Sequence, residues 1–272
     1  MITQNDIKII YNIDKYMPTN IKTIADNTAE TWQPNRATAE KINDINLGKL
    51  AENIISSYIK INISQIQYLS YDTFRADSEK IHAPFDGLLF SSNVNKNILK
   101  ELLEEINETK DEFGRIADSL KRKILYNKIY TTEIKSTRIT SRLKNNDKVD
   151  TNKILNDDFL EYPRFMRYDK NNQINNLQDY LSFVNSDKYK RSIYNEKTLK
   201  EIEMENMRHI YVRVYIDTEY KIAYIIGAIS RGVFMKTMIL KKMIQHNKSE
   251  KALYWATSLR NGENIGILSK LF

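Results

Sequence analysis

The sequence predicts an α/β protein in which a central mixed β-sheet is flanked by helices. Two observations support this fold class. Short segments rich in β-branched and aromatic residues alternate with longer segments that have apolar residues at helical spacing. The strongest strand patterns, at 210–216 and 222–229, follow each other closely and predict a hairpin inside the sheet. A chain of 272 residues is long enough for one large domain, or for a core with a small accessory domain.

The N-terminal segment has apolar residues at helical spacing, interrupted at Pro18 and Pro34. We expect this segment, residues 1–46, to be helical, with breaks at the two prolines. It either contacts a partner or only buttresses the rest of the molecule. Residues 47–272 are expected to form the main unit, which opens with a helix over about 47–60.

The next elements are expected to bring two strands together around a helical segment. A strand near 66–71 precedes Ala83–Phe90, a short strand-like segment. Residues 97–126 have an apolar stripe that predicts a long helix, interrupted or kinked near Gly114. Residues 129–137 are rich in β-branched residues and predict the strand that follows the helix.

The later part of the chain predicts one further helix and two polar regions. Residues 145–158 are polar and predict a loop. Residues 162–206 contain much Tyr, Asn, Lys and Arg, as either a recognition surface or an ordinary surface does. Residues 233–245 have helical apolar spacing and predict a C-terminal helix that packs on the core.

Composition limits the chemistry that the chain can carry. Cysteine is absent, which excludes disulfides, thiolate zinc sites and a cysteine nucleophile. The three histidines, His82, His209 and His246, are far apart in sequence and disfavour a histidine-rich metal cluster. Neither a P-loop nor a GxGxxG pattern is present. The remaining candidates for site chemistry are carboxylates, lysines and hydroxyl groups.

The charge and hydropathy of the chain suggest its surroundings. The formal net charge of +7 favours an anionic partner, with nucleic acid first and a membrane surface second. No signal peptide is visible, and no apolar run approaches the roughly 18 residues that a membrane-spanning helix requires. We therefore expect a cytoplasmic protein without a membrane span.

Three residues on the two predicted strands form a candidate catalytic set. Asp86 lies on the first strand, and Glu133 and Lys135 lie on the second. Two carboxylates on adjacent strands can share Mg²⁺, which prefers oxygen ligands. Side chains alternate along a strand, so Glu133 and Lys135 point to the same face. The lysine can then orient a bound water or neutralise charge that develops on a phosphate.

This set resembles the metal site of the PD-(D/E)xK nucleases, and among them the chain most resembles a type II restriction endonuclease. The resemblance covers Leu47–Lys135 and two later strands. Leu47–Ile55 corresponds to the first core helix of the family, in which Glu52 stands where a metal-site glutamate is expected. One departure is the long separation of Asp86 and Glu133, whose strands would have to pair across an inserted helix.

The resemblance implies a function. It implies a Mg²⁺-dependent endodeoxyribonuclease that cleaves double-stranded DNA at a specific site and works as a homodimer matched to a palindrome. Asp86 and Glu133 would be metal ligands, Lys135 a catalytic residue and Glu52 an auxiliary one. Two alternatives remain open: another nuclease of this superfamily without a fixed site, in repair or phage defence, and a non-catalytic nucleic-acid-binding protein.

Two other Glu-x-Lys triplets compete with the one at Glu133. Glu108-Thr109-Lys110 lies in a charged run with helical spacing and is interpreted as a solvated helix face. Glu219-Tyr220-Lys221 falls between the two strongest strand patterns and is interpreted as a hairpin turn. Only Glu133 and Lys135 lie within a β-rich segment.

Basic residues near the second strand are candidates for phosphate contacts. Arg138, Arg142 and Lys144 follow that strand with hydroxyl residues between them, which suits contacts to a DNA backbone. Residues 121–123, Lys-Arg-Lys, end the predicted long helix and serve either as a cap or as a phosphate contact. His82 is interpreted as a loop or groove residue that can approach the scissile phosphate.

Overall fold

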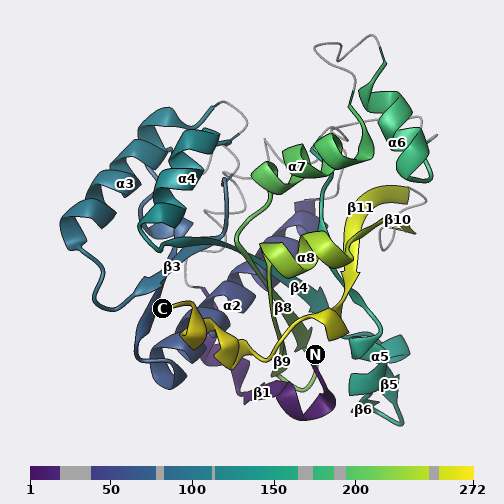
Figure 1. The fold of residues 1–272 in the computed structure, drawn as a ribbon. Helices are drawn as coiled ribbons and strands as arrows, with labels where there is room; N and C mark the ends of the chain where they lie inside the picture. Colours follow the sequence, from purple (N-terminus) through teal and green to yellow (C-terminus); the bar gives the residue numbers. More distant parts are fainter. Residues whose placement is uncertain (19–37, 78–82, 112–113, 165–173, 187–193, 245–250) are drawn as a thin grey trace.

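The computed structural model describes residues 1–18, 38–77, 83–111, 114–164, 174–186, 194–244 and 251–272 (Figure 1). The strands are β1 (Lys8–Tyr11), β2 (Ile66–Ser70), β3 (Gly87–Ser91), β4 (Tyr130–Arg138), β5 (Lys144–Asn145), β6 (Lys148–Val149), β7 (Asp158–Glu161), β8 (Ile210–Asp217), β9 (Ile222–Ser230), β10 (Ile239–Ile244) and β11 (Lys251–Ser258). The α-helices are α2 (Thr38–Asn62), α3 (Lys96–Thr109), α4 (Asp118–Tyr126), α5 (Thr151–Leu155), α6 (Leu177–Val184), α7 (Glu196–Asn206) and α8 (Arg231–Thr237).

A six-stranded mixed sheet with the order β1-β9-β8-β4-β3-β2 forms the centre of the molecule. Strands β4 and β8 run parallel, and the other neighbouring pairs are antiparallel. A smaller antiparallel sheet has the order β10-β11-β7. Helices cover the larger sheet (Figure 1), so the predicted α/β fold class with a central mixed sheet is confirmed.

The predicted hairpin of β8 and β9 is the most buried part of the sheet. Every residue of β8 is buried, because helices and loops cover both of its faces. Val212 and Val214 face a core that α2 closes, whereas Tyr211 and Tyr215 face a second core that includes residues of α7 and α8. The period-two alternation of β8 therefore separates two layers of helices.

Helix α2 lies along the first of these faces. Its buried stripe consists of apolar residues at helical spacing: Leu50, Ala51, Ile54, Ile55 and Ile59. This stripe meets Ile134 of β4 and the apolar residues of β8 on the same side of the sheet. The prediction of a helix over 47–60 is confirmed, and the helix is longer at both ends.

Helices α3 and α4 form a separate layer beside β3. Leu102 and Ile106 of α3, together with Leu120 and Ile124 of α4, bury the side chains of β3. Gly114, between the two helices, has a φ of 72°, a conformation that glycine adopts without strain. The predicted interruption near Gly114 is confirmed.

The expectation of a helical N-terminal segment is wrong for its first part. Residues 8–11 form β1, which pairs with β9 so that Lys8 lies opposite Ile225. The exposed backbone edge of β9 supplies hydrogen-bond partners that a short isolated helix would lack. Helix α2 also runs continuously through the expected boundary between residues 46 and 47. The part of the segment at 19–37 lies outside the described residues.

The predicted loop at 145–158 contains regular structure. Asn146 and Asp147 both have positive φ and turn the chain between β5 and β6. Asp150 then caps α5, because its carboxylate accepts the amides of Asn152 and Lys153. Asparagine and aspartate tolerate the left-handed conformation, so this short hairpin and cap did have a local sequence signal.

The predicted C-terminal helix at 233–245 is wrong in its second half. Helix α8 ends at Thr237, and the chain continues as β10, which pairs with β11 over Ile239–Ile244. The segment from Ile239 to Ile244 is apolar enough for either structure. Its partner strand decides between them, because pairing satisfies its backbone groups and covers it.

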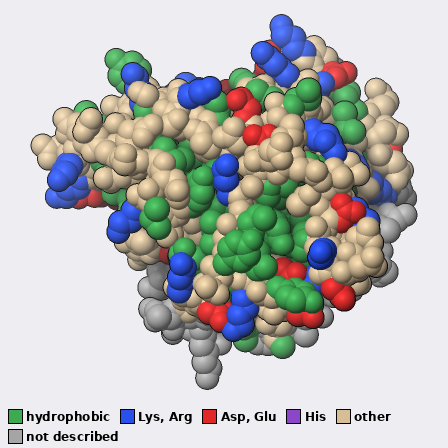
Figure 2. All heavy atoms as spheres, turned by 90° about the horizontal axis from the view of Figure 1, so that it is seen from below, with side chains coloured by type: hydrophobic (Ala, Val, Ile, Leu, Met, Phe, Trp, Pro, Cys, Tyr) green, Lys and Arg blue, Asp and Glu red, His purple; other side chains and the backbone are tan. Residues whose placement is uncertain are grey.

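The surface seen from below carries mixed charge. Figure 2 shows apolar side chains gathered near the middle of this face, with lysine and arginine side chains interspersed among acidic ones. The net charge of +7 therefore does not form a uniform basic field on this face.

Within the described ranges, the structure contains no helix with the length and apolar character needed to cross a bilayer.

Candidate functional site

Asp86 lies directly before β3, where that strand begins to pair with β4. The strands are antiparallel, and the Asp86 amide donates to the Thr132 carbonyl at 3.0 Å. The Asp86 carboxylate reaches along β4 and accepts the Ile134 amide at 2.5 Å. The two strands expected to carry the site are therefore direct neighbours, although α3 and α4 lie between them in the sequence.

Glu133 and Lys135 lie on β4 and share one face of the strand. Lys135 Nζ donates a hydrogen bond to Glu133 Oε1. The Glu133 side chain is 11% exposed, whereas that of Lys135 is 34% exposed. The carboxylate is thus nearly sealed from solvent, while the ammonium group still reaches it.

Arg208 is a site residue that sequence reasoning missed. Its Nε lies 3.1 Å from Glu133 Oε2, and its Nη1 lies 3.7 Å from Glu161 Oε2. Tyr211 donates to the same Glu161 oxygen at 2.7 Å. Arg208 stands just before β8, the strand that pairs with β4. Its approach to Glu133 was therefore predictable only once that pairing was known.

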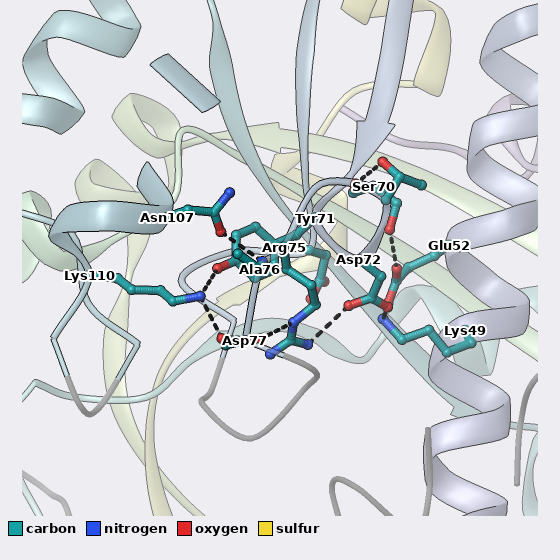
Figure 3. Close-up of polar contacts among 12 residues, drawn as sticks. Lys49, Glu52, Ser70, Tyr71, Asp72, Arg75, Ala76, Asp77, Asn107 and Lys110 are labelled. Carbon is teal, nitrogen blue, oxygen red and sulfur yellow. Dashed lines mark hydrogen bonds and ion pairs between the residues drawn. The ribbon is translucent and has the colours of Figure 1, made fainter. Parts of the chain in front are cut away.

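Glu52 lies on α2 and points toward the end of β2 (Figure 3). Its carboxylate accepts hydrogen bonds from Lys49 at 2.7 Å and from Ser70 at 3.2 Å. The helix therefore brings Glu52 to the sheet, as the resemblance implies. The same lysine contacts Asp72 at 2.5 Å, so Glu52 and Asp72 share one cation.

Glu52 is one end of a chain of alternating charges that Figure 3 shows. From Asp72 the chain continues to Arg75 at 3.1 Å and to Asp77 at 2.7 Å. Lys110, at the C-terminal end of α3, completes it with an ion pair to Asp77 at 2.5 Å and a hydrogen bond to Tyr71 at 2.8 Å. This chain fixes the segment between β2 and β3 against both helices.

The carboxylates of the site have opposite pKa shifts. Burial, reinforced by the negative charges of Glu133 and Glu52, raises the pKa of Asp86 well above its usual range. Burial alone would also raise the pKa of Glu133, but Lys135 and Arg208 outweigh it and lower that pKa to about 2. Positive charge is therefore concentrated at Glu133 and is scarce at Asp86.

The donor set fits an open magnesium site. Mg²⁺ commonly binds one or two carboxylates and keeps several waters, and Asp86 and Glu133 supply two carboxylates from paired strands. Among the residues that the structure describes, no group of three or more His, Cys, Asp and Glu side chains could hold a metal ion. Water would therefore have to complete the coordination.

The expected phosphate contacts are arranged unevenly. Arg138, at the end of β4, and Arg142 are exposed. Lys144 forms ion pairs with Asp217 at 3.0 Å and Glu219 at 2.9 Å, which reduce its attraction for a further anion. The turn between β8 and β9 brings these acids to Lys144, and nothing in the local sequence indicates that contact.

The competing Glu-x-Lys triplets have separate roles. Lys221, with a φ of 55°, lies in the turn between β8 and β9, so the hairpin interpretation of Glu219-Tyr220-Lys221 is confirmed. The interpretation of the Glu108 triplet as a solvated face is wrong for Lys110, whose side chain is only 4% exposed. Its contacts with the segment after β2 bury it.

Two predicted features fall wholly or partly outside the described residues. His82 lies there, and so do residues 165–173 and 187–193 of the Tyr- and Asn-rich region. The described remainder of that region forms α6, α7 and the segments beside them.

Comparison with known proteins adds no relative to this geometry. No protein-family model, curated protein or solved structure matches the chain. The chemistry of the site thus has to be inferred from the contacts of Asp86, Glu133, Lys135, Glu52 and Arg208.

Proposed function

We propose that this protein is a magnesium-dependent nuclease that hydrolyses phosphodiester bonds of double-stranded DNA. The observation that carries the proposal is the position of the Asp86 carboxylate against β4. It accepts the amide of Ile134, which lies between Glu133 and Lys135 in the chain. A strand pairing across two helices thus joins the three residues that the resemblance selects.

The residues have distinct roles in this proposal. Asp86 and Glu133 hold the cation, which polarises the phosphate and makes a bound water more acidic. Lys135 keeps a positive charge next to them, since Glu133 and then Glu161 stabilise its ammonium form against the effect of burial. That charge can neutralise a phosphate oxygen or orient the attacking water. Glu52 is an auxiliary carboxylate, oriented by Lys49 and Ser70.

The substrate and assembly follow from the resemblance and the charge of the chain. We infer a type II restriction endonuclease that acts as a homodimer on a specific site, because a two-fold dimer matches a palindrome. The net charge of +7 favours a polyanion. A nuclease without a fixed site would digest a plasmid to a smear, whereas a restriction enzyme would give sharp bands.

A second candidate function is a non-catalytic nucleic-acid-binding protein. The observation that favours it is the pairing of both Glu133 oxygens, one with Lys135 and the other with Arg208. Such pairing is also what a purely structural ion-pair network shows. Magnesium-dependent cleavage would eliminate this candidate.

Substitution of the two carboxylates tests the catalytic proposal. We expect Asp86→Ala and Glu133→Ala to abolish cleavage of plasmid DNA in about 5–10 mM magnesium, a working range for a weakly held hard cation. DNA binding should remain, because loss of a carboxylate reduces repulsion toward phosphate. Glu219→Ala is the matched control, since Glu219 belongs to the competing triplet in the turn.

The comparison has a clear negative outcome. Cleavage at the rate of the unaltered protein by either carboxylate variant would refute the assignment. Circular dichroism and thermal unfolding of each variant would show whether a loss of cleavage reflects a loss of the fold.

A further inference from the structure

A small pocket lies between α4, α7 and the first residue of α8, elements that lie close together in Figure 1. Its volume is about 160 Å³, well below the roughly 300–1,000 Å³ of pockets for drug-sized ligands. The pocket therefore suits a small group rather than a whole metabolite. None of the residues proposed for catalysis lines it.

Three cationic side chains from different elements line this pocket: Lys121, Arg122 and Arg231. Lys121 donates to Asp118 at 3.0 Å and to the Glu205 carbonyl at 2.8 Å, which leaves one of its three donors. Arg231 is half-buried and donates to the Met204 carbonyl at 3.3 Å, and Arg122 is exposed at the rim. Asp118 and Glu205 also line the pocket, so the cations exceed the carboxylates by one.

His209 adds a neutral donor to the pocket wall. Its Nδ1 accepts the Thr131 amide at 3.0 Å, so Nε2 carries the ring proton and can donate. Burial, with help from Arg231 and Lys121, lowers the pKa of His209 to about 3, so the ring is uncharged at neutral pH. Cations and an N–H donor around a small hollow are suited to an oxyanion such as phosphate.

The pocket is next to the candidate catalytic strand. His209 contacts Thr131, which shares a face of β4 with Glu133. Two residues of a strand span about 7 Å, so the pocket lies roughly one short step along β4 from the carboxylates. Arg208, the residue before His209, reaches Glu133 itself. An anion in the pocket and a phosphate at the carboxylates could thus belong to one ligand.

We propose that this pocket binds a phosphate group next to the cleaved one, and that the nucleic-acid backbone supplies it. The choice of the backbone rests on the proposed nuclease function. The binding of phosphate by the pocket does not, because it follows from the cations and the volume alone. A free phosphate ester is the other source of the same chemistry, and the experiment separates the two.

The first arm of the test measures phosphate binding directly. Isothermal titration with inorganic phosphate, at constant ionic strength set with chloride, should give saturable binding to the unaltered protein. We expect Arg122→Ala or Arg231→Ala to weaken it about tenfold, as loss of one charge-assisted hydrogen bond does. Lys123→Ala is the matched control, because Lys123 lies on the same helix but pairs with Glu105 outside the pocket.

The second arm measures binding to duplex DNA in Ca²⁺ over a range of salt concentrations. Arg122→Ala should lower the slope of log affinity against log salt by about one, and Lys123→Ala should leave it unchanged. Both arms measure binding in the Asp86→Ala background. A failure of the catalytic proposal therefore shows up separately, as cleavage that persists without Asp86.

Each outcome decides a part of the proposal. Absence of saturable phosphate binding, or equal weakening by Arg122→Ala and Lys123→Ala, would overturn the pocket. If Arg122→Ala weakens phosphate binding but keeps the full salt slope, the backbone assignment is overturned in favour of a free phosphate ester. Weakened phosphate binding together with a reduced slope, each specific to Arg122, supports the proposal as stated.

Discussion

Glu203 should make the stability of this protein depend on pH in the neutral range. It lies on α7 and is only 1% exposed. Its carboxyl group accepts the Tyr180 hydroxyl at 2.6 Å and the Arg164 amide at 2.8 Å. These contacts join α7 to α6 and to the segment after β7, so the protonation of one carboxyl group affects the packing of three elements.

Burial raises the pKa of Glu203 from 4.5 to about 7, against the opposing effect of its hydrogen bonds. The folded protein therefore binds this proton more tightly than the unfolded chain does. The resulting stability is present in full below about pH 4.5 and is lost as the pH rises to about 7. At about 1.4 kcal/mol per pH unit, the free energy of unfolding falls by roughly 3 kcal/mol across this window.

Replacement of Glu203 by glutamine isolates this contribution. Glutamine is close to the protonated carboxyl in shape and cannot ionise. We expect Glu203→Gln to match the unaltered protein within about 1 kcal/mol at pH 4.5 and to be about 3 kcal/mol more stable at pH 8. Urea unfolding monitored by circular dichroism at half-unit pH steps measures the difference. Glu201→Gln, at an exposed position of the same helix, is the control.

The sign of the difference is decisive. A Glu203→Gln variant that loses stability relative to the unaltered protein as the pH rises would refute the reasoning, because it would mean that the buried carboxylate is favoured as the anion. A constant difference between pH 5 and pH 8 would also contradict it, since the folded and unfolded pKa values would then be equal.

Three further predictions concern single positions. Lys110→Met should lower the free energy of unfolding by about 2 kcal/mol, because it breaks a buried ion pair, whereas Lys100→Met, at an exposed site, should change it by less than about 0.5 kcal/mol in urea unfolding. Lys135→Ala should reduce the DNA cleavage rate by roughly 10²-fold, and Lys221→Ala, in the turn, should not; the reverse order would move the active site to that turn. Gly227→Ala should lower the melting temperature by several degrees, about 2–3 kcal/mol in stability, since φ is 156° and a Cβ would lie 2.3 Å from a backbone oxygen; an unchanged melting temperature would contradict this.

Local patterns in the sequence were sufficient where one segment carries its own signal. The alternation of β8 and β9, the apolar stripe of α2 and the break at Gly114 are all readable within a few residues. Such patterns determine which face of a helix or strand is buried, because that choice depends on periodicity alone. The same alternation placed Glu133 and Lys135 on one face of β4.

Other elements depend on a partner that is remote in the sequence. Residues 8–11 become a strand because β9 presents a free edge, and Ile239–Ile244 leaves helical structure because β11 pairs with it. Lys110 has a helical charged neighbourhood, yet Asp77 and Tyr71 bury it. Local propensity is worth only a few tenths of a kcal/mol per residue, so tertiary pairing overrides it.

The candidate site shows the same division. The sequence by itself determined the residue types and the shared face of Glu133 and Lys135, since these depend on composition and on the period of a strand. Only the tertiary structure decided that Asp86 lies against β4, that Arg208 reaches Glu133 and that three cations meet beside His209. These contacts join residues far apart in the chain, and their geometry arises from the order of strands in the sheet, which no local pattern encodes.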